Sequence, residues 1–531
     1  MGYRVPAPPA GNRTQEEVSE SGNTKWIIAG TVMIGNIMAV LDSSIVNVSL
    51  PEMAGNMGAT IEEITWVVTG YILANVLVMP IIGMLSERFG RKRLYMTAIA
   101  VFTVASMLCG LAGSLTTMVA FRVLQGLAGG VLVTVPQAIL RESFPPAEQG
   151  IAMGVYGMGV VLAPAIGPTL GGWITDQYSW PWIFFINVPV GIINLMMVQR
   201  VVEDPPYLRR NTEPIDFTGL ALMIAGLGAF QLMLEEGEQN DWFESAFIIR
   251  VAAVAAVGMI LFIWRELTAE RPAVNIRILA NVRFTAATFL GGVMGMGLNG
   301  VLFILPLFLQ NLLGYTAMQS GLMLMPRSLA MLVMMPIAGR MYNRVGPRAL
   351  VGVGIGFLVY GFWDLARLTT DVGYWDLAWP QIWQGIGFSF LFAALSTAAL
   401  APLPRAEITA ATGVYNVVRQ VMGSIGIALA ATLLTHSQAT YHAVLVADSS
   451  GPAEQNWLAA TIASLQKLGA SAADAREHAL ALLDSVISRQ ATVLAYNHIF
   501  ELVALMFATV LPLLFLLPRA GTPGGETIIA E

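Results

Sequence analysis

The chain has 531 residues, of which 56% are apolar and only 12% are charged, about half the charged share of an ordinary soluble domain. This composition excludes a soluble globular protein, and the net charge of −6 says little about partners, because the charges of a membrane chain sit in its loops and tails. The three lysines never follow a glycine and the only cysteine is Cys109, which excludes a P-loop nucleotide site, a disulfide framework and CxxC metal sites, and nothing supports a nucleic-acid role or a cofactor.

Runs of roughly 20 apolar residues recur along the whole chain, and each is long enough to cross a bilayer as a helix. Residues 1–25 are polar and lack the apolar stretch of a signal peptide, so they are predicted to form a cytoplasmic tail. The rest predicts an all-α polytopic membrane protein with fourteen spans, near 26–46, 65–85, 95–114, 117–139, 150–172, 182–201, 216–234, 246–264, 284–308, 318–339, 348–367, 379–400, 408–435 and 492–516.

Positive charges predict how these spans are oriented. With the N-terminus inside, the loops on one side contain arginine or lysine at 88–93, 200–210 and 340–348. The opposite loops contain neither residue at 47–64, 173–181, 235–245 and 309–317. Because positively charged loops stay in the cytoplasm, both termini are predicted to be cytoplasmic, including a C-terminal tail at 518–531.

The chain also contains an internal repeat. Residues 80–94 align with 336–350 at an offset of 256 with six identical positions. At an offset of 259, two further pieces in spans 4 and 5 align in the same order with 384–385 and 413–415. Parallel repeats of six spans are typical of transporters that rock one half against the other around a midplane site.

The repeat predicts the domain organisation. Two six-helix bundles are separated by two inserted spans, 7 and 8, which have no counterpart in the repeat. The predicted units are an N-terminal bundle at 26–201, the inserted spans with their linkers at 202–281, and a C-terminal bundle at 282–517.

Four motifs carry a family resemblance: 41–51 ending span 1, 83–93 between spans 2 and 3, Arg122 with Gln125 in span 4, and 163–172 in span 5. With them the chain resembles the major facilitator superfamily, in particular its fourteen-span branch of drug:proton antiporters, the EmrB/QacA type. Residues 184–189 and Arg419 with 423–426 are similar to the EmrB subgroup. The resemblance covers nearly the whole chain and implies a transporter, not an enzyme, in the bacterial inner membrane.

The 83–93 motif is expected to gate the cytoplasmic side. Its glycines allow a tight turn and a close helix approach, and its charges can pair across neighbouring helix ends and separate as the halves rock. Glu87 departs from the family pattern, because the family usually has aspartate at this position. Alternatively, the arginines only set the orientation of the loop. The gating residues are Gly83, Glu87, Arg88, Gly90, Arg91 and Lys92.

The 163–172 motif combines small residues and prolines. Glycines four positions apart let helices approach closely, and prolines bend the backbone. Taken alone, this spacing predicts only packing, whereas the resemblance links it to export rather than uptake. The antiporter-motif residues are Pro164, Gly167, Pro168, Gly171 and Gly172.

Asp42 and Arg122 are predicted to form the proton-coupling site. A charge at the bilayer centre costs about 2.5 to 3.5 kcal/mol, so ionisable residues inside spans are functional candidates. Both lie roughly 25 Å above the inner surface at about 1.5 Å per helical residue, so they can pair or compete. We expect Asp42 to be the exchangeable proton site; a purely structural salt bridge is the alternative.

Arg327 and Arg419 are expected near the midplane of the second half, where no acid obviously neutralises them. Two such cations facing a cavity favour anionic or weakly acidic lipophilic substrates over cationic dyes. The alternative is that they bind backbone carbonyls and lock helices together. Asn47 and Gln125 are assigned to the same substrate cavity.

Residues 436–491 form the longest predicted segment outside the membrane apart from the termini. Ser471 to Asp474 resemble a capping box that opens a helix through Ser488, and 457–468 has helical apolar spacing. In EmrB-like exporters this region implies docking to a periplasmic membrane-fusion protein (EmrA-like) and through it to an outer-membrane channel (TolC-like). Alternatively, it is a pair of helical extensions covering the outer mouth.

Together these features predict a proton-driven multidrug efflux antiporter that exports lipophilic, anionic or weakly acidic compounds by alternating access, as the inner-membrane part of a tripartite system. One alternative is a dedicated exporter of a fatty acid or endogenous metabolite. Another is a non-transporting membrane sensor or assembly subunit. Asp42 with Arg122 and the 163–172 motif argue against the last, because anchoring needs neither.

Overall fold

A computed structural model describes residues 15–205, 214–270, 272–369, 371–449 and 451–518. Within these ranges the chain forms helices and no strands. The principal helices are α1 (Gln15–Met57), α3 (Trp66–Val78), α4 (Ile82–Phe89), α5 (Arg91–Gly110), α6 (Leu115–Ser143), α7 (Gln149–Gln177), α9 (Asn187–Val201), α10 (Phe217–Glu236), α11 (Ala246–Thr268), α12 (Val282–Leu307), α13 (Ala317–Val345), α14 (Pro347–Leu365), α15 (Tyr374–Leu400), α16 (Ile408–Asp448), α17 (Pro452–Lys467) and α18 (Ala472–Thr509).

Fourteen helical segments of the described chain are long and apolar enough to cross a bilayer, which confirms the predicted number. Short elements interrupt or precede some spans: α2 (Ile61–Ile64) and α8 (Trp182–Phe185) lead into spans 2 and 6. A 3₁₀ turn at Met79–Ile81 separates α3 from α4, because Pro80 cannot donate the backbone hydrogen bond that an α-helix needs there.

The repeat is visible in the packing of the two halves. Gly90 and Gly346, 256 residues apart in the sequence, end α4 and α13 with φ angles of +86° and +83°, a conformation that glycine adopts without strain. A Cβ at Gly154 of α7 would lie 2.6 Å from the carbonyl oxygen of Met335. The backbone of Gly413 in α16 abuts the carbonyl of Met79 in the same manner, so one interhelical contact occurs twice.

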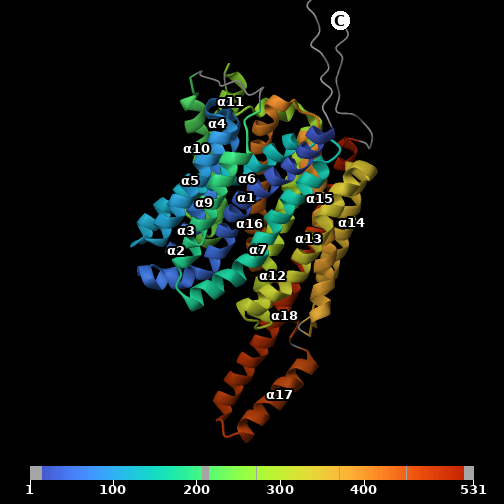
Figure 1. Cartoon of the computed structure of the whole chain (residues 1–531). Helices are drawn as coiled ribbons and strands as arrows, with labels where there is room; N and C mark the ends of the chain where they lie inside the picture. The colour runs from blue at the N-terminus through green and yellow to red at the C-terminus, as the bar shows by residue number, and fades with distance from the viewer. Residues whose placement is uncertain (1–14, 206–213, 271, 370, 450, 519–531) are drawn as a thin grey trace, which may run out of the picture.

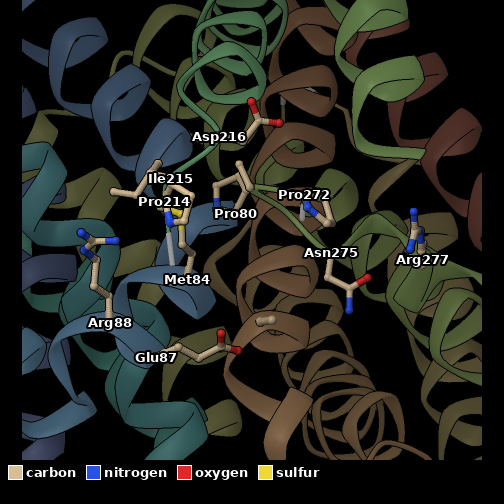
Figure 2. A pocket seen from close by; sticks show the side chains of 12 residues that line it. Pro80, Met84, Glu87, Arg88, Pro214, Ile215, Asp216, Pro272, Asn275 and Arg277 are labelled. Atoms are coloured by element: carbon tan, nitrogen blue, oxygen red, sulfur yellow. The ribbon is translucent and has the colours of Figure 1, made fainter. Parts of the chain in front are cut away.

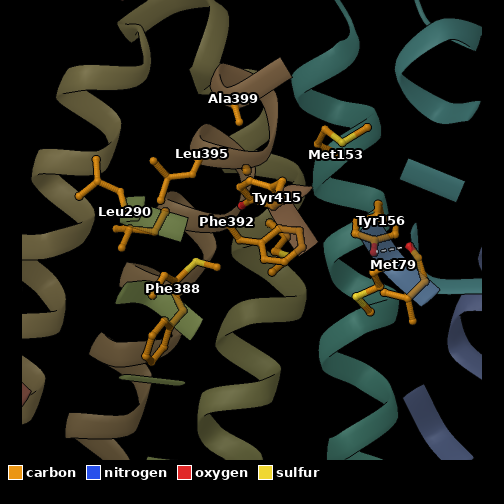
Figure 3. Close-up of a cluster of buried hydrophobic side chains, with 14 of the residues drawn as sticks. Met79, Met153, Tyr156, Leu290, Phe388, Phe392, Leu395, Ala399 and Tyr415 are labelled. Atoms are coloured by element: carbon orange, nitrogen blue, oxygen red, sulfur yellow. Dashed lines mark hydrogen bonds between the residues drawn. The ribbon is translucent and has the colours of Figure 1, made fainter. Parts of the chain in front are cut away.

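These contacts close the predicted cytoplasmic end between the two halves. Gly150 of α7 abuts the backbone of Gly339 in α13. Asn416 of α16 donates to Gln137 Oε1 of α6 at 3.0 Å. Aromatic packing continues this seam toward the midplane, where Figure 3 shows Tyr156 of α7 and Phe392 of α15 within one buried cluster, their rings stacked 6.0 Å apart. The structure is therefore closed at the predicted cytoplasmic end, and we call this the inner-closed state.

The inserted spans lie beside the two bundles. α10 and α11 pack through Gly226 and Gly258, where a Cβ on Gly226 would lie 2.5 Å from the backbone nitrogen of Met259. α10 also contacts α3 of the first half and α16 of the second half. The small residues let α10 and α11 approach closely, and α10 consequently bridges the halves.

The segment 436–491 is helical almost throughout, and we call it the outer hairpin. α16 has 41 residues and α18 has 38, so at 1.5 Å per residue both are longer than a bilayer is thick, and both helices extend beyond their spans without a break. Ser471 caps α18 by accepting from the Asp474 amide at 3.2 Å. Figure 1 shows this hairpin with α17 projecting from the end of the bundle opposite to both ends of the described chain.

Candidate functional site

Asp42 lies on α1, fully buried, in a network of hydrogen-bond donors. Its Oδ2 is 2.5 Å from Arg122 Nη1 of α6. Its Oδ1 accepts from Gln125 Nε2 and from Asn187 Nδ2, each at 2.9 Å. Every one of these partners donates, so the arrangement is that of the ionised carboxylate. Asp42 and Arg122, which the sequence predicted to lie at the same depth in the membrane, thus form a buried ion pair.

Arg122 is held from several sides. Its Nε donates to the carbonyl of Val67 in α3 at 3.0 Å, and its Nη1 donates to Gln125 Oε1 at 2.8 Å. The guanidinium carbon also lies 4.2 Å from the centroid of the Tyr71 ring, a cation–π contact that partly replaces hydration. Arg122 therefore connects spans 1, 2 and 4 through one side chain.

Asn187 is a residue of this network that sequence analysis did not assign. It begins α9, and its amide donates both to Asp42 and to Ser106 Oγ at 3.0 Å. Its position in the 184–189 motif, as the only strongly polar residue there, was a usable signal. Asn47 is exposed and lies outside the network.

The 163–172 motif packs against the part of α1 that directly follows Asp42. A Cβ on Gly167 would lie 2.9 Å from Ser44 Cβ, and one on Gly171 would lie 2.8 Å from the Ile45 carbonyl oxygen. Gly172 is less tightly held, 3.8 Å from the Val48 side chain by the same measure. α7 contains Pro164 and Pro168 and remains a continuous helix. Because of these close contacts, a movement of α7 would displace the part of α1 that positions Asp42.

Arg91, in the motif at 83–93 that is predicted to gate the cytoplasmic side, forms a cluster of polar contacts that we call the latch. Arg91 donates to both carboxylate oxygens of Glu142, at 2.5 and 3.0 Å, and to Thr409 Oγ1 at 2.9 Å. Glu142 belongs to α6 and Thr409 to α16, so Arg91 ties the first half to the second. Sequence analysis did not identify either partner. Lys92 instead donates from its side chain to the Gln199 carbonyl in its own half and from its backbone amide to Asp204 in the following linker, both at 2.7 Å.

A cavity of about 430 Å³ adjoins this latch. Figure 2 shows Glu87 and Arg88 of α4 on one side and Asn275 and Arg277, from the linker before α12, on the other. Asp216 caps α10 at the rim by accepting from the Gly219 amide at 3.0 Å. The hydrogen bond from Arg265, 2.9 Å away, holds the pKa of the Asp216 carboxyl below its usual value.

Arg327 and Arg419 of the second half have surroundings of their own. Arg327 is 2% exposed, and its Nη1 has no hydrogen-bond partner in the described chain. Arg419 is partly buried, with its guanidinium carbon 5.5 Å from the centroid of Phe392. In the described chain, no ion pair joins either arginine to Asp42, whose cationic partner is Arg122.

Comparison with known proteins identifies the family. The family model of the Major Facilitator Superfamily matches residues 32–427. The chain belongs to the major facilitator superfamily. This membership, together with fourteen candidate spans, makes the chain a multi-pass membrane transporter and not an enzyme.

Curated superfamily relatives align over nearly full length. The chain is 35% identical to the fatty acid resistance protein FarB of Neisseria gonorrhoeae, over 92% of this chain and 95% of the relative. It is 33% identical to the multidrug export protein EmrB of Escherichia coli K12, over 96% and 99%. It is 31% identical to the colistin resistance protein EmrB of Acinetobacter baumannii, over 93% and 96%.

Solved superfamily structures share the fold at low sequence identity. The human organic anion transporter MFSD10 superposes with a TM-score of 0.60 at 14% identity, covering 91% of this chain and 99% of that one. The proton:xylose symporter XylE superposes with a TM-score of 0.59 at 12% identity, covering 95% and 98%. These likenesses concern the fold alone.

Proposed function

We propose that this transporter is a proton-driven multidrug exporter of the bacterial inner membrane. The observation that carries the proposal is the buried carboxylate of Asp42, which lies in the ionised state between an arginine and two amides. The relatives named for multidrug export and for fatty acid and colistin resistance support an exporter of lipophilic compounds.

Exchange at Asp42 follows from its contacts. A proton on the carboxyl removes the charge that Arg122 neutralises and converts one acceptor oxygen into a donor. The 2.5 Å contact with Arg122 is then no longer favourable, so spans 1 and 4 lose the ion pair between them. Antiport requires that the Asp42 carboxyl release its proton before the cargo is moved across the membrane. One proton at a potential of roughly 150 mV sustains about a 300-fold gradient of a neutral substrate.

A reconstituted system tests this function. Liposomes containing the purified chain and a fluorescent lipophilic drug are expected to release the drug when the medium is acidified, because protons enter as drug leaves. A matched liposome at equal pH on both sides is the control. Energisation by ATP or sodium in place of the pH step would contradict the proposal.

We propose that the cargo includes anionic or weakly acidic compounds, because Arg327 and Arg419 supply one buried and one partly buried positive charge in the second half. Arg419→Gln is expected to reduce export of an acidic substrate by about 10- to 150-fold, on the order of one charge-assisted hydrogen bond, and to leave a quaternary ammonium compound unaffected. Accumulation of both compounds in the same cells measures this. Equal loss for both would assign the arginine to helix packing.

A dedicated fatty acid exporter is the second candidate function. The observation that favours it is the 35% identity to FarB over 92% of the chain. A competition experiment separates the two: a narrow exporter is inhibited only by fatty acids, whereas a multidrug exporter is inhibited by structurally unrelated lipophilic compounds as well.

We further propose that the outer hairpin docks a periplasmic membrane-fusion protein of a tripartite system. Large apolar side chains are exposed along it, outside the predicted bilayer: Trp457 at 41%, Leu468 at 85% and Val486 at 57% exposure. Exposed apolar side chains gathered in one segment are typical of interaction sites.

Replacing residues 449–470 with a short Gly-Ser linker tests this docking. The substitution removes α17 and spares the contact of His442 with Asp484, 3.0 Å apart, at the base of the hairpin. We expect pull-down of the fusion protein to be lost while drug release from liposomes is unchanged. Loss of transport with retained pull-down would instead make the hairpin a cover of the outer mouth.

A further inference from the structure

Two consecutive carboxylates end the inserted helix α10 where it bridges the halves. Glu235 Oε1 accepts from Gln231 Nε2 at 2.7 Å and from Ser424 Oγ of α16 at 3.1 Å. Glu236 is 6% exposed and lies 3.5 Å from Thr69 Oγ1 of α3. One acid thus contacts the second half and its neighbour contacts the first half.

Neither carboxylate has a cation beside it. In the described part of the chain, no ion pair joins Glu235 or Glu236 to a lysine, arginine or histidine. The charged or titratable groups on the elements around them interact elsewhere: Tyr71 with Ala39, Arg250 with Ala246, Arg419 with Phe392, His436 with Thr432, and Glu238 with Thr432, Thr435 and Trp242. Two adjacent negative charges would therefore stand uncompensated.

Gln231 gives an independent sign of a missing proton. This side chain is fully buried, and its Oε1 has no hydrogen-bond donor in the described chain. Its Nε2 faces Glu235 Oε1 and Ser424 Oγ, each at 2.7 Å. If the amide is turned, its oxygen faces Glu235 and that contact requires a proton on the carboxyl. If it is not turned, its oxygen remains an unpaired buried acceptor.

We propose that Glu235 and Glu236 form a second proton-binding site, in which one proton is held at Glu235 beside Gln231 while Glu236 carries the negative charge. Two carboxylates in one low-dielectric site cannot both ionise without a counter-charge, so the pair retains a proton where a single exposed glutamate would release it. This occupancy is a property of the resting protein and does not depend on which cargo is exported.

The position of the pair links it to the Asp42 network through α3. The Val67 carbonyl accepts from Arg122, and the Thr69 hydroxyl contacts Glu236. Val67 and Thr69 lie within one turn of α3 at 3.6 residues per turn, so this turn contacts both acidic sites. Because the contact with Thr69 is longer than those of Glu235, span 7 is expected to move with the second half.

Infrared spectroscopy of the full-length protein tests the proposal. At pH 7 we expect wild type to show a protonated-carboxyl C=O band that Glu235→Gln/Glu236→Gln lacks, with a loss of about one bound proton per protein. Each single variant is expected to lose the band too, because the remaining carboxylate ionises without its neighbour. Glu238→Gln is the matched control and keeps the band, since Glu238 accepts hydrogen bonds from hydroxyls at the rim.

Two outcomes would overturn the second site. One is an identical protonated-carboxyl band in wild type and the double variant. The other is a band that sodium removes and potassium does not, which would show that a metal cation occupies the pair. Glutamine has nearly the same shape as glutamate, and the elution of each single variant from a sizing column verifies that it is folded.

Discussion

Replacing Asp42 with asparagine is expected to reduce pH-driven drug release to the level of protein-free liposomes. Asparagine has the shape of the carboxyl group but cannot bind and release a proton. The substitution also leaves Arg122, a fully buried cation, without its counter-charge, and removing one partner of a buried pair costs on the order of 3 to 5 kcal/mol. Lost transport alone would therefore not distinguish lost coupling from lost folding.

A second variant makes that distinction. Asp42→Asn combined with Arg122→Gln removes both charges, so we expect the double variant to regain the thermal stability of wild type and to remain inactive. Asp376→Asn is the control, because it makes the same substitution at an aspartate far from the proposed coupling site in the sequence. Asp376 is exposed and accepts a hydrogen bond from the Gly373 amide at 2.8 Å at the start of α15. If Asp42→Asn retained full, pH-dependent release, Asp42 would not be the coupling residue.

Much of this architecture is predictable from apolar runs and loop charges. The fourteen spans follow from length and hydropathy, because a bilayer leaves no other way to satisfy the backbone. The pairing of Asp42 and Arg122 follows from counting residues from the inner surface, since helical rise is constant. The internal repeat also aligns Gly90 with Gly346 in the sequence. In the structure each of these glycines ends a helix with a positive φ.

The remaining features depend on tertiary contacts that sequence spacing does not contain. Span 7 was expected to end at 234, whereas α10 continues through Glu236, so its two terminal acids were assigned to a loop. Glu142 lies at a helix end, where a charge is ordinary, and only the fold brings it to Arg91. For the outer hairpin the sequence predicted a helix at 457–468 and another from Ser471 through Ser488, with a pair of helical extensions as the alternative. Hydropathy falls at the membrane surface and so does not show that α16 and α18 continue without a break.

The repeated glycine contact at the inner seam gives the second large prediction. A side chain at Gly154 would meet the Met335 carbonyl at 2.6 Å, and one at Gly413 would meet the Met79 carbonyl. Both obstruct the inner-closed state and neither obstructs a state in which the inner ends have separated. Overpacking costs about 1 to 3 kcal/mol per site, so Gly154→Val/Gly413→Val is expected to shift the population toward the inner-open state by at least tenfold and to stop transport.

Spin labels on cysteines at Phe89 and Arg405 measure this shift, because these exposed positions end α4 and precede α16 at the inner seam. The native Cys109 is buried and should label little. We expect the distance between the labels to lengthen in the double variant and to stay unchanged in Gly356→Val, where a Cβ meets no atom within 4 Å. Because the two contacts are copies of one another, each single variant should produce a similar partial shift. An unchanged distance in the double variant, with transport retained, would mean that the inner ends do not separate at these glycines and that the halves move about some other seam.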